Sequence, residues 1–226
     1  MVIYNFKWEF LSILKCYNAL MENINAKDKH YNTLDELIEQ ANKHLFIPFG
    51  VLDKTGRIQN LKDKGKLGTI VEEAIFEIKI NNRPEPDIPN LSVELKTTPF
   101  KRNKNGSISA KERTVLNIID FNKENLDNFY ASHLWDKCSQ ILFLFYDGTK
   151  DDRPIVEYYV QKTYFFKWLE EDMPTIIEDF LRITNKIKIG KAETLSESDG
   201  NYLSTCTKGR GHGKDMRTQP FSNTLA

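Results

Sequence analysis

A nearly continuous apolar segment places the strongest constraint on how this chain can fold. The segment SQILFLFYD, residues 139–147, carries apolar side chains at successive positions. A strand with one exposed face alternates between apolar and polar residues, whereas an unbroken apolar run is typical of a strand that is covered on both faces. We therefore expect a central strand here, in a mixed sheet flanked by helices, which is an α/β or α+β fold.

Helical periodicity marks three candidate covering helices. In the first, Thr33 is a candidate N-cap and Glu36 follows three residues later, which is the pattern of a capping box. In the third, Pro174 lies in the first turn and Gly190 marks the end. The segments are residues 32–45, 64–80 and 173–190.

Three further segments have the composition of strands. An Asn-Gly turn at Asn105 and Gly106 separates the first of them from the second. The segments are LSVELKTT at 91–98, RTVLNIIDF at 113–121 and PIVEYYVQKTYFF at 154–166. Together with the central strand they complete the predicted sheet.

Composition bounds the class of protein. Among the 226 residues, 32 are basic and 32 are acidic, so net charge indicates no partner and any nucleic-acid surface must be local. Cys16, Cys138 and Cys206 form neither a CxxC pair nor a zinc spacing, which favours a reduced protein of the cytoplasm. No apolar run approaches the ~18 residues that a membrane span needs.

The chain divides into two regions on its sequence. Residues 1–60 are predicted to be helical, and residues 1–20 within them have the pattern of an amphipathic helix rather than a signal peptide. Residues 61–226 hold the predicted sheet and end in a basic, glycine-rich segment.

The clearest chemical pattern lies at the approach to the strand at 91–98. Residues two apart in a strand face the same way, so Glu94 and Lys96 share one face. If Asp87 lies in a neighbouring strand or in the preceding turn, its carboxylate comes close to Glu94. Two nearby carboxylates repel unless a proton or a cation separates them, and hard oxygen ligands suit Mg²⁺ beside a substrate phosphate. The pattern predicts a metal site for phosphodiester hydrolysis, and a solvated strand face is the competing interpretation.

Longer motifs add a family resemblance. They are K-G-x-x-G-x-x-x-E at 64–72, D-x(6)-E-x-K followed by T-x-P-F, and KERTVLNII at 111–119. Together they resemble the MutH mismatch-repair endonuclease and, still more, the Sau-type restriction endonucleases. These families belong to the PD-(D/E)-x-K nuclease superfamily and act at GATC. The likeness begins near Lys64 and continues more thinly to the end of the chain.

The resemblance implies roles for individual residues. Asp87 and Glu94, with the carbonyl of Leu95, match the family's metal ligands. Lys96 matches its catalytic lysine. Glu72 closes the K-G-x-x-G-x-x-x-E motif and matches an active-site acid, although spacing alone indicates an ordinary solvated helix glutamate.

A second lysine is implied by the segment SHLWDK. It resembles the family's S-H-x-x-x-K, so Lys137 matches an active-site lysine near the scissile phosphate. No role is assigned to His133, which is expected to pack or to cap a helix, because attack by a metal-bound hydroxide requires no histidine base.

The basic tail has two interpretations. As a sequence, it is either a solvated end of the chain or a glycine-rich loop that orders on phosphate. GNYLSTCTKGR resembles the family's G-x-Y-L-x-x-C-T-K-G segment, which lies in the DNA-recognition region. MutH has an arginine where this chain has Cys206, so that contact is not transferred. The predicted DNA-binding residues are Lys208, Arg210, Lys214 and Arg217.

The resemblance implies a Mg²⁺-dependent endonuclease of restriction type that cuts double-stranded DNA, with GATC as the expected site and 5′-phosphate ends. A MutH-like nicking enzyme of mismatch repair is the first alternative, and a DNA-binding module without catalysis is the second. A homodimer and a dimer formed on DNA both remain open. The chain lacks the family's later basic, aromatic segment, so we expect it to be truncated, with a C-terminal domain missing.

Overall fold

The computed structural model describes residues 29–81, 84–122, 124, 126–149, 152–206 and 219. The helix predicted for residues 1–20 lies outside the described residues. Among the helices that are described, none has the length and apolar character needed to cross a membrane.

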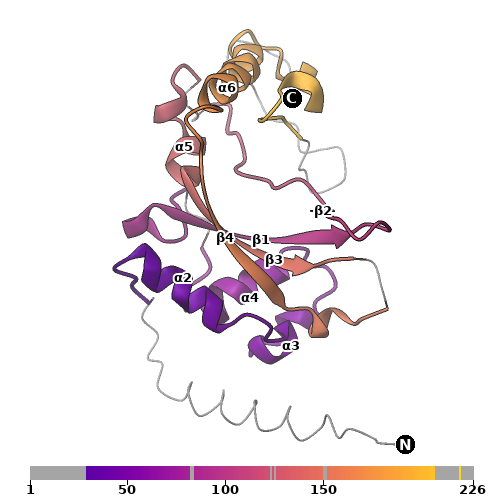
Figure 1. Cartoon of the computed structure of the whole chain (residues 1–226). Coiled ribbons are helices and arrows are strands. Elements are labelled where there is room, and N and C mark those ends of the chain that lie inside the picture. Colours follow the sequence, from indigo (N-terminus) through magenta and orange to yellow (C-terminus); the bar gives the residue numbers. More distant parts are fainter. Residues whose placement is uncertain are drawn as a thin grey trace, which may run out of the picture. The chain divides into compact units, whose positions relative to one another are not determined.

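Four strands form one mixed sheet in the order β2-β1-β3-β4 (Figure 1). The strand predicted from SQILFLFYD is β3, and its place inside the sheet confirms the expected central strand. Strand β2 pairs antiparallel with the end of β1 across the predicted Asn-Gly turn. The strands are β1 (Val93–Arg102), β2 (Ile108–Ala110), β3 (Gln140–Asp147) and β4 (Val160–Lys167).

The chain forms two compact units, and strands β1, β3 and β4 each contribute residues to both of them. The first unit takes Met1–Asn81, Thr97–Glu112 and Leu144–Thr163. The second takes Asn82–Lys96, Arg113–Phe143 and Tyr164–Ala226. The predicted boundary after residue 60 remains a prediction.

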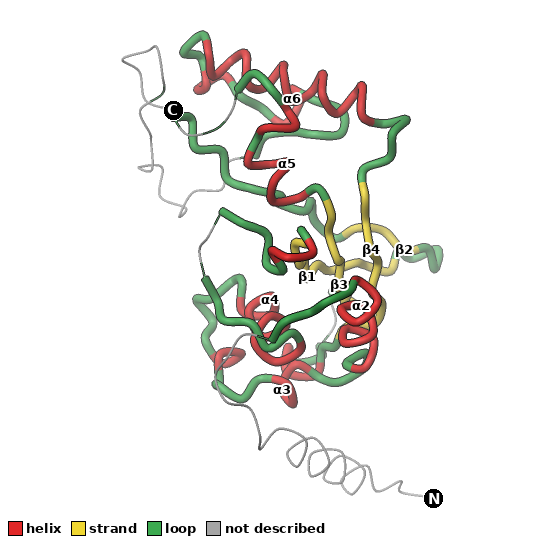
Figure 2. The backbone as a smooth tube through the Cα atoms, turned by 90° about the vertical axis from the view of Figure 1, so that its left-hand side faces the viewer, coloured by secondary structure: helices red, strands yellow, loops and turns green. Residues whose placement is uncertain are grey.

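Helices of the first unit gather on one side of its strands (Figures 1 and 2). The predicted cap of α2 is present, because Thr33 Oγ1 accepts a hydrogen bond from the Glu36 amide, while the Glu36 carboxylate accepts one from the Asn32 amide. Apolar side chains from the helices, including Leu37, Phe49 and Ile70, are fully or almost fully buried. The helices are α2 (Leu34–Lys43), α3 (Phe49–Leu52) and α4 (Lys66–Ile70).

The helix predicted for residues 64–80 is shorter than expected. It consists of α4 and a π-helical turn, Val71–Ile75, and ends at Phe76. Carbonyl groups at a helix end need other donors, and here Gln40 Nε2 donates to the Ile75 carbonyl at 2.7 Å and Tyr31 Oη to the Phe76 carbonyl at 3.0 Å. These side chains complete the helix end, so periodicity alone overestimated its length.

The second unit has its own apolar core between α5 (His133–Cys138) and α6 (Met173–Lys188) (Figure 2). Phe129 lies in edge-to-face contact with Trp135, Trp168 and Phe180. Buried residues of α6 repeat at helical spacing, as its sequence predicted. The helix has Pro174 in its first turn, and Gly190 follows its end with φ of 67°.

Two strand predictions need correction. Residues 113–120 form no strand, because Leu116 and Ile119 pack against the core of the second unit while Ile118 is exposed. The apolar side chains of this segment pack against the core, but its backbone does not pair with a neighbouring strand. The strand predicted at 154–166 begins only at Val160, after a 3₁₀ turn at Ile155–Glu157.

Candidate active site

The approach to β1 folds back on the strand that follows it. Ile88 forms an antiparallel bridge with Val93, and the intervening 3₁₀ turn ends at Ser92 in the left-handed region. The Leu95 amide then donates to Asp87 Oδ2 at 2.9 Å. Asp87 therefore lies in the preceding turn and is fixed against the start of β1.

Glu94 lies at the centre of the site. Its side chain is only 3% exposed, and Lys96 Nζ on the same strand donates to its Oε1 at 2.6 Å. Lys137 Nζ lies 3.3 Å from its Oε2. Glu94 and Lys96 thus share a strand face, with one ammonium group beside each oxygen of the carboxylate.

Helix α5 brings Lys137 to the site. Ser132 caps the helix through a hydrogen bond from the Trp135 amide at 3.1 Å, and Glu124 Oε1 accepts from the His133 amide at 2.8 Å. Lys137 Nζ also donates to the Glu85 carbonyl at 3.2 Å. His133 thus takes part in the helix cap through its backbone, and its side chain is 42% exposed.

The electrostatics of the site disfavour a second negative charge. Burial raises the pKa of Asp87 from its ordinary 3.8 to about 6, and the charge of Glu94 adds to the rise. The Leu95 amide and the two lysines oppose this shift. A nearby cation would therefore stabilise the ionised form of Asp87.

The donor set fits a hard divalent ion. Glu94 Oε2 is buried and accepts no hydrogen bond, although Lys137 lies within ion-pair distance. In the described part of the chain, no group of three or more His, Cys, Asp or Glu side chains forms a metal cluster. The predicted ligands are two carboxylates and the Leu95 carbonyl, and Mg²⁺ binds through few carboxylates with several waters.

Glu72 belongs to the first unit, where it lies in the π-helical turn after α4.

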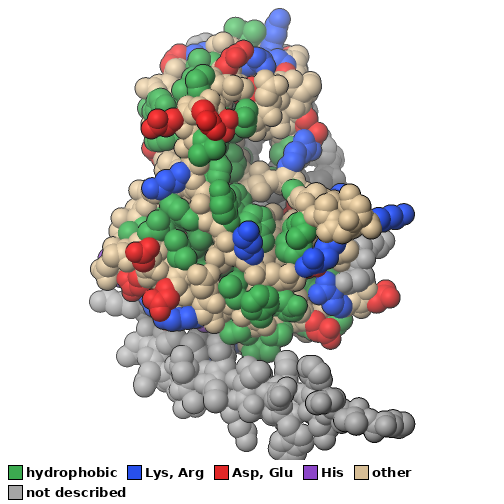
Figure 3. Space-filling view, viewed as in Figure 1, with side chains coloured by type: hydrophobic (Ala, Val, Ile, Leu, Met, Phe, Trp, Pro, Cys, Tyr) green, Lys and Arg blue, Asp and Glu red, His purple; other side chains and the backbone are tan. Residues whose placement is uncertain are grey.

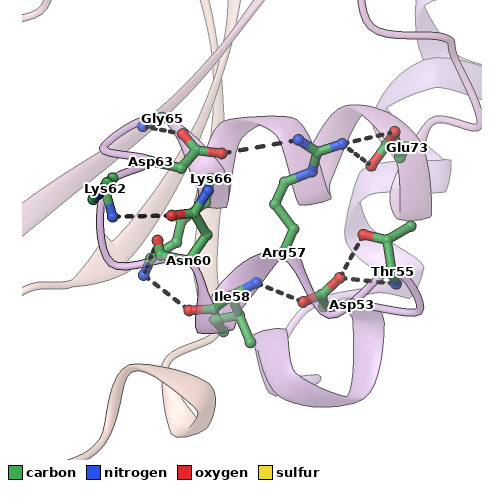
Figure 4. Close-up of polar contacts among 10 residues, drawn as sticks. All are labelled: Asp53, Thr55, Arg57, Ile58, Asn60, Lys62, Asp63, Gly65, Lys66 and Glu73. Atoms are coloured by element: carbon green, nitrogen blue, oxygen red, sulfur yellow. Dashed lines mark hydrogen bonds and ion pairs between the residues drawn. The ribbon is translucent and has the colours of Figure 1, made fainter.

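A polar network fixes the start of helix α4, as Figure 4 shows. Arg57 forms ion pairs with Asp63 and Glu73. Lys66 is buried and its Nζ donates to two backbone carbonyls, those of Ile58 and Asn60. The active-site role of Glu72 remains a prediction.

The predicted DNA-binding residues lie outside the described part of the chain. These are Lys208, Arg210, Lys214 and Arg217.

The turn that leads toward this tail has an anchor that sequence reasoning missed. Asp179 on α6 is fully buried, and its Oδ2 accepts from the amides of Asn201, Tyr202 and Leu203 at 2.7–3.1 Å. A Cβ at Gly200 would lie 1.8 Å from the Leu203 carbonyl oxygen, so glycine is required there. The motif contained that glycine, but no sequence signal indicated Asp179.

Comparison with known proteins finds a matching family. The family model described as DNA mismatch repair enzyme MutH matches residues 76–179. The type II restriction enzyme Sau3AI of Staphylococcus aureus is 37% identical over 209 residues, which are 91% of this chain and 40% of that enzyme. The MutH protein of Shewanella woodyi is 30% identical over 182 residues, 78% of this chain and 76% of that protein. The MutH protein of Haemophilus influenzae is 26% identical over 181 residues, 78% of each chain.

The mixed sheet with its flanking helices is the fold of the PD-(D/E)-x-K nuclease class, as expected. Within that class, the chain belongs to the family of MutH and the Sau-type restriction endonucleases. The chain spans 40% of the length of Sau3AI.

Proposed function

We propose that this chain is the catalytic domain of a Mg²⁺-dependent, site-specific endonuclease that cuts double-stranded DNA. The observation that supports this most is the buried Glu94 carboxylate, held between Lys96 and Lys137 beside Asp87. A carboxylate pair supplies oxygen ligands for a metal, and the two lysines supply positive charge for a phosphate.

Asp87, Glu94 and the Leu95 carbonyl would hold Mg²⁺. When bound, Mg²⁺ acts as a Lewis acid that lowers the pKa of water and balances charge on a phosphoryl oxygen. The raised pKa of Asp87 is consistent with this role, because a cation favours the ionised carboxylate over the protonated one.

The two lysines have different roles in the proposed reaction. Lys96 Nζ orients or deprotonates the attacking water and stabilises the developing negative charge. Lys137 Nζ contacts the scissile phosphate. Water attacks phosphorus in line, the bond from phosphorus to the 3′ oxygen breaks, and that oxygen takes a proton. The products are a 5′-phosphate and a 3′-hydroxyl. In this proposal, Glu72 supports the attacking water or the metal.

We propose GATC as the recognition sequence, since the family resemblance implies it. Lys208 would contact a base edge, and Arg210, Lys214 and Arg217 would contact the backbone. Lysine donates well to the O6 and N7 acceptors of guanine in the major groove, and GATC offers one guanine on each strand.

A restriction enzyme is the first choice, because identity to Sau3AI is 37% against 30% for MutH of Shewanella woodyi. A nicking enzyme of mismatch repair is the second, because the chain covers 76% of that MutH protein. A DNA-binding module without catalysis has no need for a buried carboxylate between two lysines. We propose a cytoplasmic enzyme that acts as a homodimer or as a dimer formed on DNA.

Incubation of the purified chain with a supercoiled plasmid tests these alternatives. With Mg²⁺, a restriction-type enzyme produces linear DNA with ends at one sequence, whereas a nicking enzyme accumulates open circles. With EDTA in place of Mg²⁺, cleavage should stop. Absence of both products in Mg²⁺ would contradict nuclease activity, and sequencing the ends identifies the site.

A further inference from the structure

The hairpin of β1 and β2 spans residues 99–111 of the first unit. Phe100, Lys101 and Arg102 pair with Ala110, Ser109 and Ile108. In Figure 1 its turn extends away from the other strands.

The turn of the hairpin is ordered by its own hydrogen bonds. The Asn103 amide donates to the Ser107 carbonyl at 2.8 Å, and the Gly106 amide donates to the Asn103 carbonyl at 2.9 Å. Asn105 Oδ1 accepts from the amide and the hydroxyl of Ser107 at 3.1 and 2.7 Å. Gly106 has φ of 81°, a conformation that other residues rarely adopt.

The base of the hairpin is equally well fixed. The Lys111 amide donates to the Pro99 carbonyl at 3.2 Å, and the Gly148 amide donates to the Phe100 carbonyl at 2.9 Å. A Cβ on Gly148 would lie 2.6 Å from Pro99 Cβ, so the hairpin packs closely against this glycine. An ordered surface of this kind loses little conformational entropy when it binds a partner.

The two faces of the hairpin differ in chemistry. Alternation places Phe100 and Arg102 on one face, and there Phe100 is buried while Arg102 pairs with Asp147 at 2.8 Å. The other face carries Lys101, which is directly opposite Ser109. Lys111 follows the end of β2, where its side chain lies beside Gly148. Ile108 on the first face is exposed, and Pro99 at the base of the second face is buried, so the second face differs mainly in its two lysines.

The hairpin carries three lysines. Lys101, Lys104 and Lys111 are exposed, and among the described residues no carboxylate lies within ion-pair distance of them. The chain as a whole has a net charge of zero, so this concentration is local. Figure 3, seen in the same direction, shows several basic side chains on its right-hand side, with acidic side chains among them.

We propose that the basic face of this hairpin, Lys101 and Lys111 with Lys104 at the turn, binds the phosphate backbone of duplex DNA. Unpaired ammonium groups on an exposed surface complement phosphates, and such contacts hold DNA without reading its sequence. The inference rests on the proposed function and adds a second contact surface apart from the catalytic residues.

Binding to a duplex without GATC, in EDTA and over a range of salt concentrations, tests the hairpin. The test variant is Lys101→Ala/Lys111→Ala, and the matched control is Lys43→Ala/Lys162→Ala, which removes two exposed lysines from α2 and β4. Each phosphate contact contributes about 0.9 to the salt slope, so the slope of the test variant should fall by about 1.8. By the same relation its Kd in 0.1 M salt should rise about 60-fold.

The control should bind as the unmodified chain does. Equal binding by test and control variants would overturn the proposal, and so would an equal loss in both. Lys104→Glu, placed on the turn, is the second variant if the first one does not fold, and it should also weaken binding. Plasmid cleavage by the unmodified chain is measured in parallel. If the unmodified chain does not cut DNA but the test variant has a lower salt slope, the proposed nuclease activity is rejected and the hairpin proposal stands. If the unmodified chain cuts DNA but the test variant binds as tightly as the control, the hairpin proposal is rejected and the nuclease activity stands.

Discussion

Lys137 Nζ lies 3.3 Å from Oε2 of Glu94, and this contact joins helix α5 to strand β1 within the second unit. Lys96 occupies the other carboxylate oxygen, at 2.6 Å from Oε1. The Glu94 side chain is almost completely buried between these two ammonium groups. Removal of either lysine leaves one oxygen of the buried carboxylate without its ammonium partner.

Lys137→Ala should slow cleavage about 100-fold or more, because a positive charge near the scissile phosphate is lost. DNA affinity should change much less than the rate at saturating enzyme. Lys191→Ala, an exposed lysine of the same unit, is the control and should cleave normally. Single-turnover rates measure the effect, and a normal rate for Lys137→Ala would remove this residue from the mechanism.

Asp87→Asn should raise the stability of the metal-free protein near neutral pH. The folded protein binds the Asp87 proton more tightly than the unfolded chain, with a pKa of about 6 against an ordinary 3.8. Stability from this group is therefore complete below pH 3.8 and is lost as pH rises to about 6. The shift corresponds to at most about 3 kcal/mol.

Thermal unfolding with and without Mg²⁺ measures both consequences for Asp87. Mg²⁺ should raise the Tm of the unmodified chain more at pH 7.5 than at pH 5, and it should not raise the Tm of Asp87→Asn. Glu170→Gln, an exposed change, is the control. An equal effect of Mg²⁺ on the unmodified chain and on Asp87→Asn would exclude Asp87 as a ligand.

Asp179→Ala should reduce the free energy of unfolding by about 3 kcal/mol, because three backbone amides lose their buried acceptor. Glu178→Ala, an exposed change on the same helix, should cost within about 0.5 kcal/mol. Urea unfolding of both variants provides the comparison. A similar cost for the two would mean that the turn at Asn201–Leu203 does not depend on the carboxylate.

Lys208→Ala should lower the preference for GATC over its single-base variants, because a good base contact provides about 1–3 kcal/mol of discrimination. Lys214→Ala should instead weaken binding to every sequence and reduce the salt slope by about 0.9. Binding competition between GATC and variant duplexes separates the two effects. If Lys208→Ala changed neither affinity nor preference, the basic tail would have no role in recognition.

Local patterns predicted much of the fold because local forces determine those parts. Apolar continuity identified β3, and the Asn-Gly pair identified the turn of the β1–β2 hairpin. The segment 113–121 was wrongly predicted as a strand, because apolar side chains show that residues are buried but not whether their backbone pairs. The end of the helical segment at Phe76 was missed for a related reason. The carbonyl groups there accept hydrogen bonds from Gln40, on α2, and from Tyr31, just before α2, and both are distant in the sequence.

The candidate site could be predicted from the sequence where its residues are close together along the chain. Strand alternation alone places Glu94 beside Lys96, and that pair is present. Lys137 followed only from the family resemblance, because its approach to Glu94 depends on how α5 packs. Asp179 could not be predicted, since its partners are backbone amides that leave no residue pattern.

The cleavage rate of Lys96→Ala on a duplex with a single GATC tests the central claim most directly. It is measured in Mg²⁺, at enzyme concentrations that saturate the DNA, so that binding does not limit the rate. The account predicts that cleavage falls below detection while the Kd for the duplex in EDTA stays within a few-fold of the unmodified chain. Cleavage by Lys96→Ala at the unmodified rate would contradict the assignment of Asp87, Glu94, Lys96 and Lys137 as the catalytic site.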